Sequence, residues 1–149
     1  ETYGGADYGC GVPGMIRAGG GKDIYYDQTP YYFNANPEDV AKRNPDFIFK
    51  GIAEPQGYFM ESDSILKELR DNVSSRVELA NTNAVKNGHV YAISFDATSG
   101  LRKKFGPIFI AKALYPEKFQ DIDPEGFLLK YLADYLKLPP QGVYIYPKI

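Results

Sequence analysis

Hydrophobic positions follow two different periods along this chain. Phe47-Ile48-Phe49 is a short apolar run bounded by turn residues, which is typical of a parallel strand buried on both faces. Val90-Tyr91-Ala92-Ile93 is rich in residues that favour β-structure and is expected to lie in a sheet. From Phe127 to Leu136 the apolar residues recur at i, i+1, i+4, i+5, i+8 and i+9, which predicts a helix with one broad apolar stripe. Strands that alternate with helices predict an α/β fold.

Capping residues and prolines indicate where the helices begin and end. Asn36 is suited to be an N-cap and Pro37 to be the first helical residue, so this pair predicts a helix that continues through Arg43. Further helices are expected over 12–18, from Ser62 or Asp63 to about Asp71, over 108–114, and after Asp123-Pro124-Glu125. Two segments are left less regular: a glycine- and tyrosine-rich loop over 1–11 and a possible edge strand over 143–146.

Length and composition narrow the class of protein. A chain of 149 residues is long enough for one domain with its own core. The net charge of −2 argues against a nucleic-acid partner, which would require a basic face. The chain has 13 tyrosines and no tryptophan, and tyrosine is favoured at recognition surfaces because it combines an apolar ring with a hydroxyl group.

Motifs for catalysis or metal binding are weak. Gly9 to Gly14 formally match the dinucleotide pattern G-x-G-x-x-G, but no strand pattern precedes them. His89 is the only histidine and follows a turn, so we expect an exposed turn residue there, with no catalytic triad and no metal site. Asp121, Asp123 and Glu125 lack EF-hand spacing and are expected to cap a helix. We therefore predict no catalytic residue, no metal ligand and no cofactor.

Three stretches carry a family resemblance: NPDFIFKGI (44–52), AVKNGHVYAI (84–93) and AKALYPEKFQDIDPEGF (111–127). They resemble the C-terminal lobe of the solute-binding proteins that deliver iron-siderophore, haem and cobalamin-type complexes to ABC importers. The resemblance extends from Gly9 to Leu138. It implies a three-layer α/β/α lobe with a small, mainly parallel sheet, which is one half of a two-lobed protein joined by a long helix.

The resemblance also implies a function, partners and a location. The expected function is extracytoplasmic binding of a metal chelate (a ferric siderophore, haem or a corrinoid) in a cleft between two lobes, followed by delivery to the membrane permease of an ABC importer. The expected partners are the chelate, the permease and a missing N-terminal lobe, and no nucleic acid. We expect a longer, lipid-anchored precursor. The alternatives are an enzyme lobe of chelatase or nitrogenase type and an interaction module without transport.

The expected binding residues follow from topology, since ligands of open parallel sheets bind beyond the carboxyl ends of the strands. Aromatic side chains suit a flat macrocycle or a catecholate, and an arginine suits an anionic chelate. The residues expected to bind ligand after strand ends are Tyr3, Tyr8, Tyr58, Phe59 and Arg102.

The resemblance further implies a glutamate that docks onto arginines of the permease, from the loop after Phe49. Glu54 and Glu61 both fit this position, and a helix-capping role is an equal alternative for Glu61. The family's lobe ends near Leu138. We therefore divide the chain into a lobe over 1–138 and a tail over 139–149, to which no function is assigned.

Overall fold

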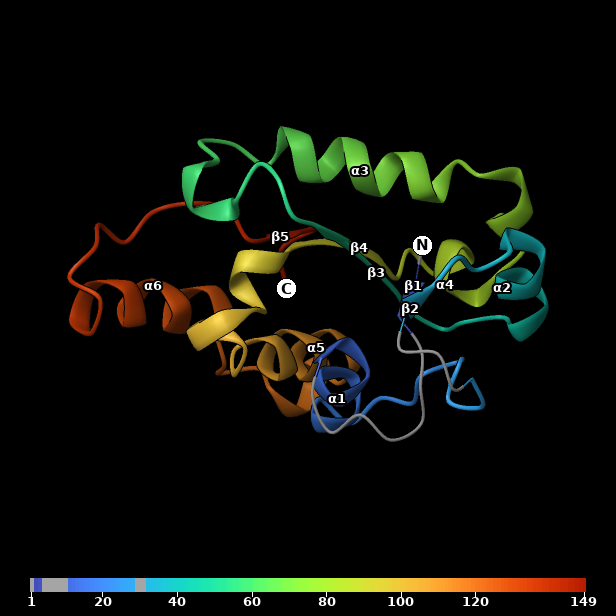
Figure 1. Cartoon of the computed structure of the whole chain (residues 1–149), viewed down its shortest axis with the longest axis horizontal. Helices are drawn as coiled ribbons and strands as arrows, with labels where there is room; N and C mark the ends of the chain where they lie inside the picture. The colour runs from blue at the N-terminus through green and yellow to red at the C-terminus, as the bar shows by residue number, and fades with distance from the viewer. Residues whose placement is uncertain (1, 4–10, 29–31) are drawn as a thin grey trace.

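The computed structural model describes residues 2–3, 11–28 and 32–149 (Figure 1). The α-helices of the described residues are α1 (Gly11–Ala18), α2 (Pro37–Arg43), α3 (Ser64–Ser74), α4 (Asn83–Lys86), α5 (Gly106–Leu114) and α6 (Pro124–Asp134). The strands are β1 (Thr2–Tyr3), β2 (Tyr32–Phe33), β3 (Ile48–Ile52), β4 (Val90–Ser94) and β5 (Ile145–Tyr146).

The main sheet has three strands in the order β3-β4-β5. β3 and β4 are parallel and in register from the Ile48–Val90 pair to the Ile52–Ser94 pair. β5 runs antiparallel to β4 and pairs Tyr146 with Ala92. The strands β1 and β2 form a separate antiparallel pair. The described sheet is therefore mainly parallel, as the sequence predicts.

Helices cover both faces of this sheet, so the fold has three layers (Figure 1). α3 lies on one face, and α1, α5 and α6 lie on the other. β4 serves both layers because its side chains alternate between the faces. Tyr91 and Ile93 pack into the larger core cluster with residues of α5 and α6, whereas Ala92 packs with Leu66 of α3.

Local sequence signals set the ends of several helices, as predicted. Asn36 is the N-cap of α2, and its side-chain oxygen accepts a hydrogen bond from the amide of Glu38 at 2.8 Å. Asp123 caps α6 in the same way and accepts from the amide of Gly126 at 2.9 Å. Both caps satisfy an amide that would otherwise lack a partner in the first helical turn.

The prediction for β3 and the capping alternative for Glu61 need correction, whereas Asp63 is one of the two residues predicted at the start of α3. All five residues of β3 are partly exposed, although the sequence predicts a strand buried on both faces. The reason is that β3 is the edge strand of the described sheet. Asp63 occupies the N-cap position of α3 without a capping side-chain hydrogen bond, so neither Ser62 nor Glu61 fills that position.

The tail over 139–149 packs against the lobe. β5 lies within it, and the side chains of Tyr144 and Ile145 are fully buried in the larger core cluster. The Tyr144 amide donates to the Glu125 carboxylate of α6 at 3.2 Å, and the Tyr144 carbonyl accepts from the Ser94 amide at 2.9 Å. The tail thus lies beside the carboxyl end of β4.

Candidate functional site

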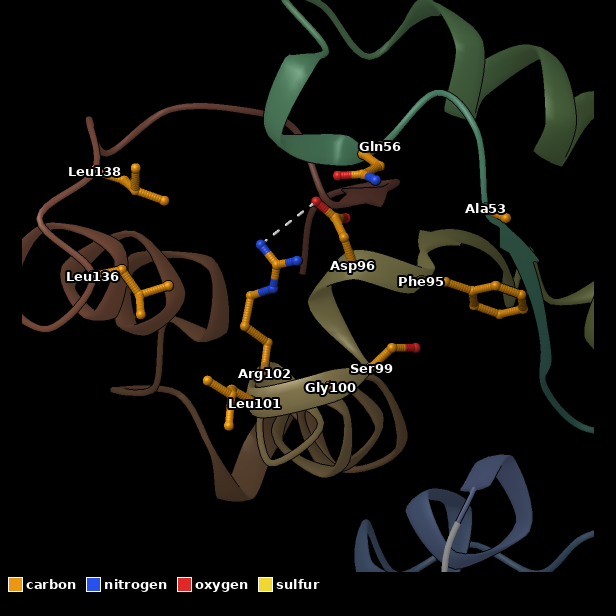
Figure 2. A pocket seen from close by; sticks show the side chains of 10 residues that line it. All are labelled: Ala53, Gln56, Phe95, Asp96, Ser99, Gly100, Leu101, Arg102, Leu136 and Leu138. Atoms are coloured by element: carbon orange, nitrogen blue, oxygen red, sulfur yellow. Dashed lines mark ion pairs between the residues drawn. The ribbon is translucent and has the colours of Figure 1, made fainter.

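A cavity of about 570 Å³ lies beyond the carboxyl ends of β3 and β4 (Figure 2). Its walls come from the loop after β3, from the two 3-10 turns after β4, η3 (Phe95–Ala97) and η4 (Gly100–Arg102), and from the chain after α6. The lining residues are Ala53, Gln56, Phe95, Asp96, Ser99, Gly100, Leu101, Arg102, Leu136 and Leu138. Parallel strands bring these loops to one edge of the sheet because their carboxyl ends lie side by side.

Asp96 is the buried polar centre of this region and is only 7% exposed. Its Oδ1 accepts from the amide of Gly57 at 3.1 Å, and its Oδ2 accepts from the amide of Tyr58 at 3.1 Å. The hydroxyl of Ser94 also donates to Oδ1. Because a buried carboxylate is stable only when its oxygens have partners, these bonds account for the burial of Asp96.

The same bonds hold the turn η1 (Gly57–Phe59) against the end of β4. The Gly57 amide also donates to the Ser94 hydroxyl oxygen at 2.9 Å, so Ser94 and Asp96 share this donor. A side chain at position 57 would meet the Val143 carbonyl oxygen at 2.6 Å, so only glycine allows the tail to approach this closely. The loop after β3 is therefore fixed by residues that follow β4.

Arg102 extends across the cavity toward Asp96 (Figure 2). Its Nη1 lies 3.9 Å from Asp96 Oδ2, and its side chain is 25% exposed. At that distance the ion pair is loose, and the two oxygens of Asp96 already accept three shorter hydrogen bonds. A guanidinium group has five N–H donors, so Arg102 keeps donors that a bound ligand can use.

The other lining side chains include both polar and apolar groups. Gln56 offers an amide and Ser99 a hydroxyl, while Leu101, Leu136 and Leu138 offer apolar contact. Leu101 is 75% exposed, which leaves its side chain open to contact at this rim. A few polar groups on an apolar wall are typical of small-molecule sites.

The predicted ligand residues are only partly brought together. Arg102 lines the cavity, whereas Tyr58 and Phe59 lie in η1 beside it and are not among the lining residues. Tyr58 is half-buried against the larger core cluster, and Phe59 is exposed and meets the Tyr58 ring edge-on at 5.2 Å. Only the backbone of Tyr3 is described, and Tyr8 lies outside the described residues.

The two predicted docking glutamates lie on either side of η1 and are both exposed. Glu54 follows β3 and forms a cis peptide bond with Pro55. Neither glutamate has an ion pair with another described residue. His89 differs from the exposed turn residue expected from sequence, because it is partly buried and its ring stacks on Phe47 at 4.4 Å.

The sequence analysis missed Asp96, Ser94 and Gln56. A signal for the first two is present, since Ser94-Phe95-Asp96 places two polar residues directly after an apolar strand. Leu136 and Leu138 carry no such signal, because their position at the cavity depends on where the chain runs after α6.

The described residues offer neither a membrane-spanning helix nor a group of metal ligands. No helix in the described part of the chain is long and apolar enough to cross a membrane. Over residues 2–3, 11–28 and 32–149, no three side chains of histidine, cysteine, aspartate or glutamate are grouped closely enough to hold a metal ion.

Comparisons with known proteins give matches among solved structures alone. No protein-family model and no curated sequence matches the chain. The TroA-like periplasmic binding protein FepB from Veillonella parvula matches with a TM-score of 0.75 and 26% identity, over 89% of this chain and 40% of that one. The molybdate-bound periplasmic binding protein MolA of Haemophilus influenzae matches with a TM-score of 0.67 and 19% identity, over 87% of this chain and 38% of that one.

A third solved structure agrees with these two. CeuE of Helicobacter pylori with Ni(II) bound matches with a TM-score of 0.62 and 21% identity, over 83% of this chain and 38% of that one. The chain thus spans about 40% or less of the length of each of these proteins. The 149 residues therefore have the α/β fold of one lobe of a TroA-like periplasmic binding protein, which confirms the fold class and the family resemblance predicted from sequence.

Proposed function

We propose that this chain is one lobe of an extracytoplasmic solute-binding protein that captures a metal chelate and delivers it to the permease of an ABC importer. The observation that carries the proposal is the guanidinium of Arg102 in a partly apolar cavity at the carboxyl ends of two parallel strands. The likeness to three periplasmic binding proteins supports it. The chelate is a ferric siderophore, haem or a corrinoid.

The chemistry is binding and release, with no covalent step. Arg102 donates hydrogen bonds to an anionic group of the chelate, and the leucines of the rim cover its apolar part. Asp96 fixes the rim turn but does not compete strongly for Arg102, because its oxygens accept from two amides and a hydroxyl. One lobe covers only one side of a ligand, so tight binding requires the second lobe.

An enzyme lobe of chelatase or nitrogenase type is the alternative from another class. Such chemistry requires a histidine or paired acids placed over a metal. His89 lies at the opposite, amino-terminal end of β4, stacked on Phe47. No specific observation favours this alternative.

The ligand arm of the proposal is tested with the full two-lobed protein. Isothermal titration is carried out with a ferric catecholate siderophore, haem and cobalamin, and with molybdate and Ni(II) because similar proteins bind them. Arg102→Ala is expected to weaken binding of the chelate roughly 10- to 100-fold, the effect of losing a hydrogen bond to a charged group. Lys103→Ala, an exposed neighbour, is the control and is expected to bind normally.

Unchanged affinity in Arg102→Ala contradicts the assignment of the cavity. The rim aromatics are tested separately by alanine at Tyr3, Tyr8, Tyr58 and Phe59. If the protein binds molybdate or Ni(II) but none of the chelates, the solute-binding function stands and the proposed ligand class is wrong.

The transport arm concerns Glu54 and Glu61, of which one is proposed to contact a permease arginine. Charge reversal by Glu54→Lys or Glu61→Lys is expected to reduce uptake at least 10-fold while ligand affinity stays the same, since a charge-assisted contact contributes about 1.5–3 kcal/mol. Glu68→Lys on the exposed side of α3 is the matched control. Normal uptake by both variants places docking elsewhere.

A further inference from the structure

Phe59 is one of the most exposed large apolar side chains among the described residues, at 69%. Its neighbours are not exposed in this way. Gly57 is buried, Tyr58 packs partly buried against the larger core cluster, and Met60, directly after η1, is 5% exposed. Phe59 is also absent from the residues that line the cavity, so ligand contact in the cavity does not explain its exposure.

The turn that carries Phe59 is fixed by contacts from distant parts of the chain. The Gly57 amide donates to the Ser94 hydroxyl oxygen at 2.9 Å, and the Gly57 carbonyl accepts from the Val143 amide at 2.9 Å. The ring of Tyr58 supports the Phe59 ring edge-on at 5.2 Å. A side chain that is already held in place loses little conformational freedom when a partner covers it. Phe59 is therefore presented in a form suited to binding.

Acidic side chains lie on either side of Phe59 along the chain, without any base. Over 53–65 the sequence carries Glu54, Glu61 and Asp63 and no lysine or arginine. All three carboxylates are exposed, and none has an ion pair with another described residue. The segment around η1 is therefore a locally negative surface with one aromatic ring in it.

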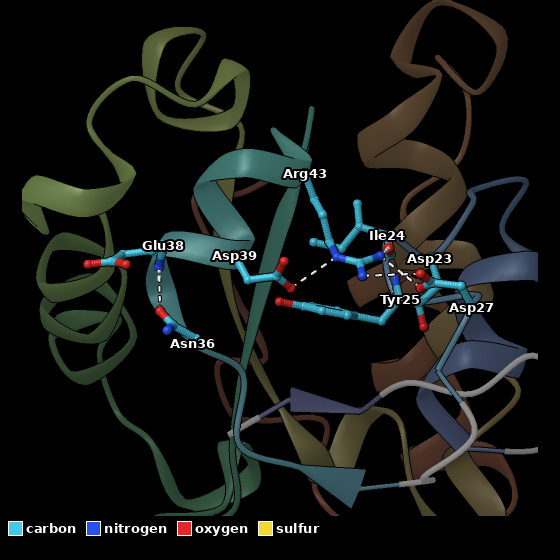
Figure 3. Close-up of polar contacts among 8 residues, drawn as sticks. All are labelled: Asp23, Ile24, Tyr25, Asp27, Asn36, Glu38, Asp39 and Arg43. Atoms are coloured by element: carbon cyan, nitrogen blue, oxygen red, sulfur yellow. Dashed lines mark hydrogen bonds and ion pairs between the residues drawn. The ribbon is translucent and has the colours of Figure 1, made fainter.

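Several acids elsewhere on the described surface have partners within the chain. Asp27 and Asp39 both pair with Arg43, at 2.8 Å and 3.0 Å (Figure 3). Asp134 of α6 pairs with Lys130 at 2.7 Å. The carboxylates near η1 are instead available to cations of another molecule, and complementary charge of this kind orients a partner and selects against wrong ones.

An aromatic side chain within a polar rim is the usual arrangement of a protein interface. The ring enters an apolar pocket of the partner and supplies most of the binding energy, while the surrounding polar groups exclude water. Phe59 with Glu54 and Glu61 has this arrangement on one short segment. The partner that fits it is a protein surface with an apolar pocket and basic side chains at the edge of that pocket.

We propose that Phe59 is the apolar anchor of the permease contact and enters an apolar pocket of the permease, whose edge carries the basic side chains that meet Glu54 or Glu61. This inference rests on the proposed function and adds to it a residue that binds by apolar burial. It also moves Phe59 from the ligand, where the sequence predicted it, to the membrane partner. Salt screens the carboxylates but not the burial of the ring, so the two parts of the contact are separable.

Binding of the full two-lobed protein to its permease in lipid nanodiscs, measured by biolayer interferometry, tests this proposal. Phe59→Ala is expected to raise the dissociation constant roughly 30-fold, the effect of losing an aromatic anchor, at low salt and in about 0.5 M NaCl alike. Phe59→Leu keeps an apolar side chain and is expected to raise it by about 5-fold or less. Both variants are expected to fold, because the side chain is exposed.

The matched control is Val77→Ala, which is expected to bind the permease normally. Val77 is 85% exposed and lies in the turn η2 (Val77–Leu79), beyond the far end of α3 from η1. Titration of Phe59→Ala with the ferric catecholate siderophore, haem and cobalamin is expected to match that of the wild-type protein. A 10-fold loss of affinity in that titration, a size set by one lost contact, assigns Phe59 to the ligand and overturns the inference.

Normal permease binding by Phe59→Ala also overturns the inference and leaves the proposed function in place. If Phe59→Ala in addition lowers the unfolding temperature of the full-length protein, the ring contacts the second lobe. If it abolishes a dimer seen by light scattering, the ring contacts a second copy. Absence of permease binding by the wild-type protein rejects the transport arm of the proposed function, and this inference with it.

Discussion

β4 and β3 are neighbouring parallel strands of equal length, yet their environments differ. All five residues of β4 are buried, whereas all five residues of β3 are partly exposed. β4 has a hydrogen-bonded neighbour on each side, while β3 has one among the described residues. β3 also carries Lys50 and Gly51, but its apolar residues Ile48, Phe49 and Ile52 are partly exposed as well, which follows from its position at the edge of the described sheet.

Two aspartates show the same contrast. Asp96, beyond the end of β4, has both oxygens hydrogen-bonded, and Asp23, beside the outer edge of β3, has one buried oxygen without a hydrogen-bond partner among the described residues. The polar groups at the carboxyl end of the sheet are thus hydrogen-bonded within this chain, whereas those beside the outer edge of β3 are only partly so among the described residues. The rim of the cavity is therefore held by contacts within this chain, whereas no described strand lies beside the outer edge of β3.

The largest expected effect comes from matched isoleucines in the two strands. Ile93→Ala in β4 removes a side chain that is 2% exposed and is expected to lower the free energy of unfolding of the 149-residue chain by about 2–5 kcal/mol. Ile48→Ala in β3 removes a partly exposed side chain and is expected to lower the free energy of unfolding by about 1 kcal/mol. Urea denaturation measures both, and equal losses would contradict the difference in environment.

An intermediate effect is expected at Asp96. Asp96→Asn replaces one carboxylate oxygen by an NH2 group that cannot accept a hydrogen bond, so either the Tyr58 amide or the Ser94 hydroxyl loses its acceptor. The expected loss in the free energy of unfolding is about 1.5–3 kcal/mol. Asp63→Asn is the control, since Asp63 is exposed and its side chain makes no capping bond. A loss no larger than that of the control would mean that the bonds of Asp96 are not required for the rim.

The smallest effect, of opposite sign, is expected at Asp23. Burial raises the pKa of the Asp23 carboxyl, and the hydrogen bond from the Tyr25 amide opposes this. Because the folded pKa lies above the unfolded one, the stability linked to protonation is present at acid pH and is lost as the pH rises through the folded pKa. Asp23→Asn is therefore expected to stabilise the isolated chain at pH 7 by about 0.5 kcal/mol.

The stability that Asp23→Asn is expected to add depends on pH. It is expected to shrink as the pH is lowered below the ordinary pKa of an aspartate, since the raised pKa of Asp23 means that the wild-type carboxyl binds a proton there. Denaturation curves at pH 3.5 and pH 7 measure this dependence, and an equal gain at both pH values would contradict it.

Local sequence determined the elements of this protein. Asn36 with Pro37 and Asp123 with Pro124 set the starts of α2 and α6, because caps and prolines act on the backbone groups of their own helical turn. The run from Val90 to Ile93 predicts β4 for a similar reason, since its residue types favour a strand. The position of Arg102 after a strand end also follows from the order of elements.

Tertiary structure alone decided the rest. Asp96 meets the amides of Gly57 and Tyr58 across 39 and 38 positions of sequence, and Leu136 and Leu138 reach the cavity from beyond α6. The exposure of β3 depends on which strands lie beside it, which its own residues do not encode. Contacts between distant residues arise from the packing of whole layers. The apolar runs that predict β3 and β4 are similar in sequence, and only the folded chain shows that β4 has a strand on each side and β3 has one among the described residues.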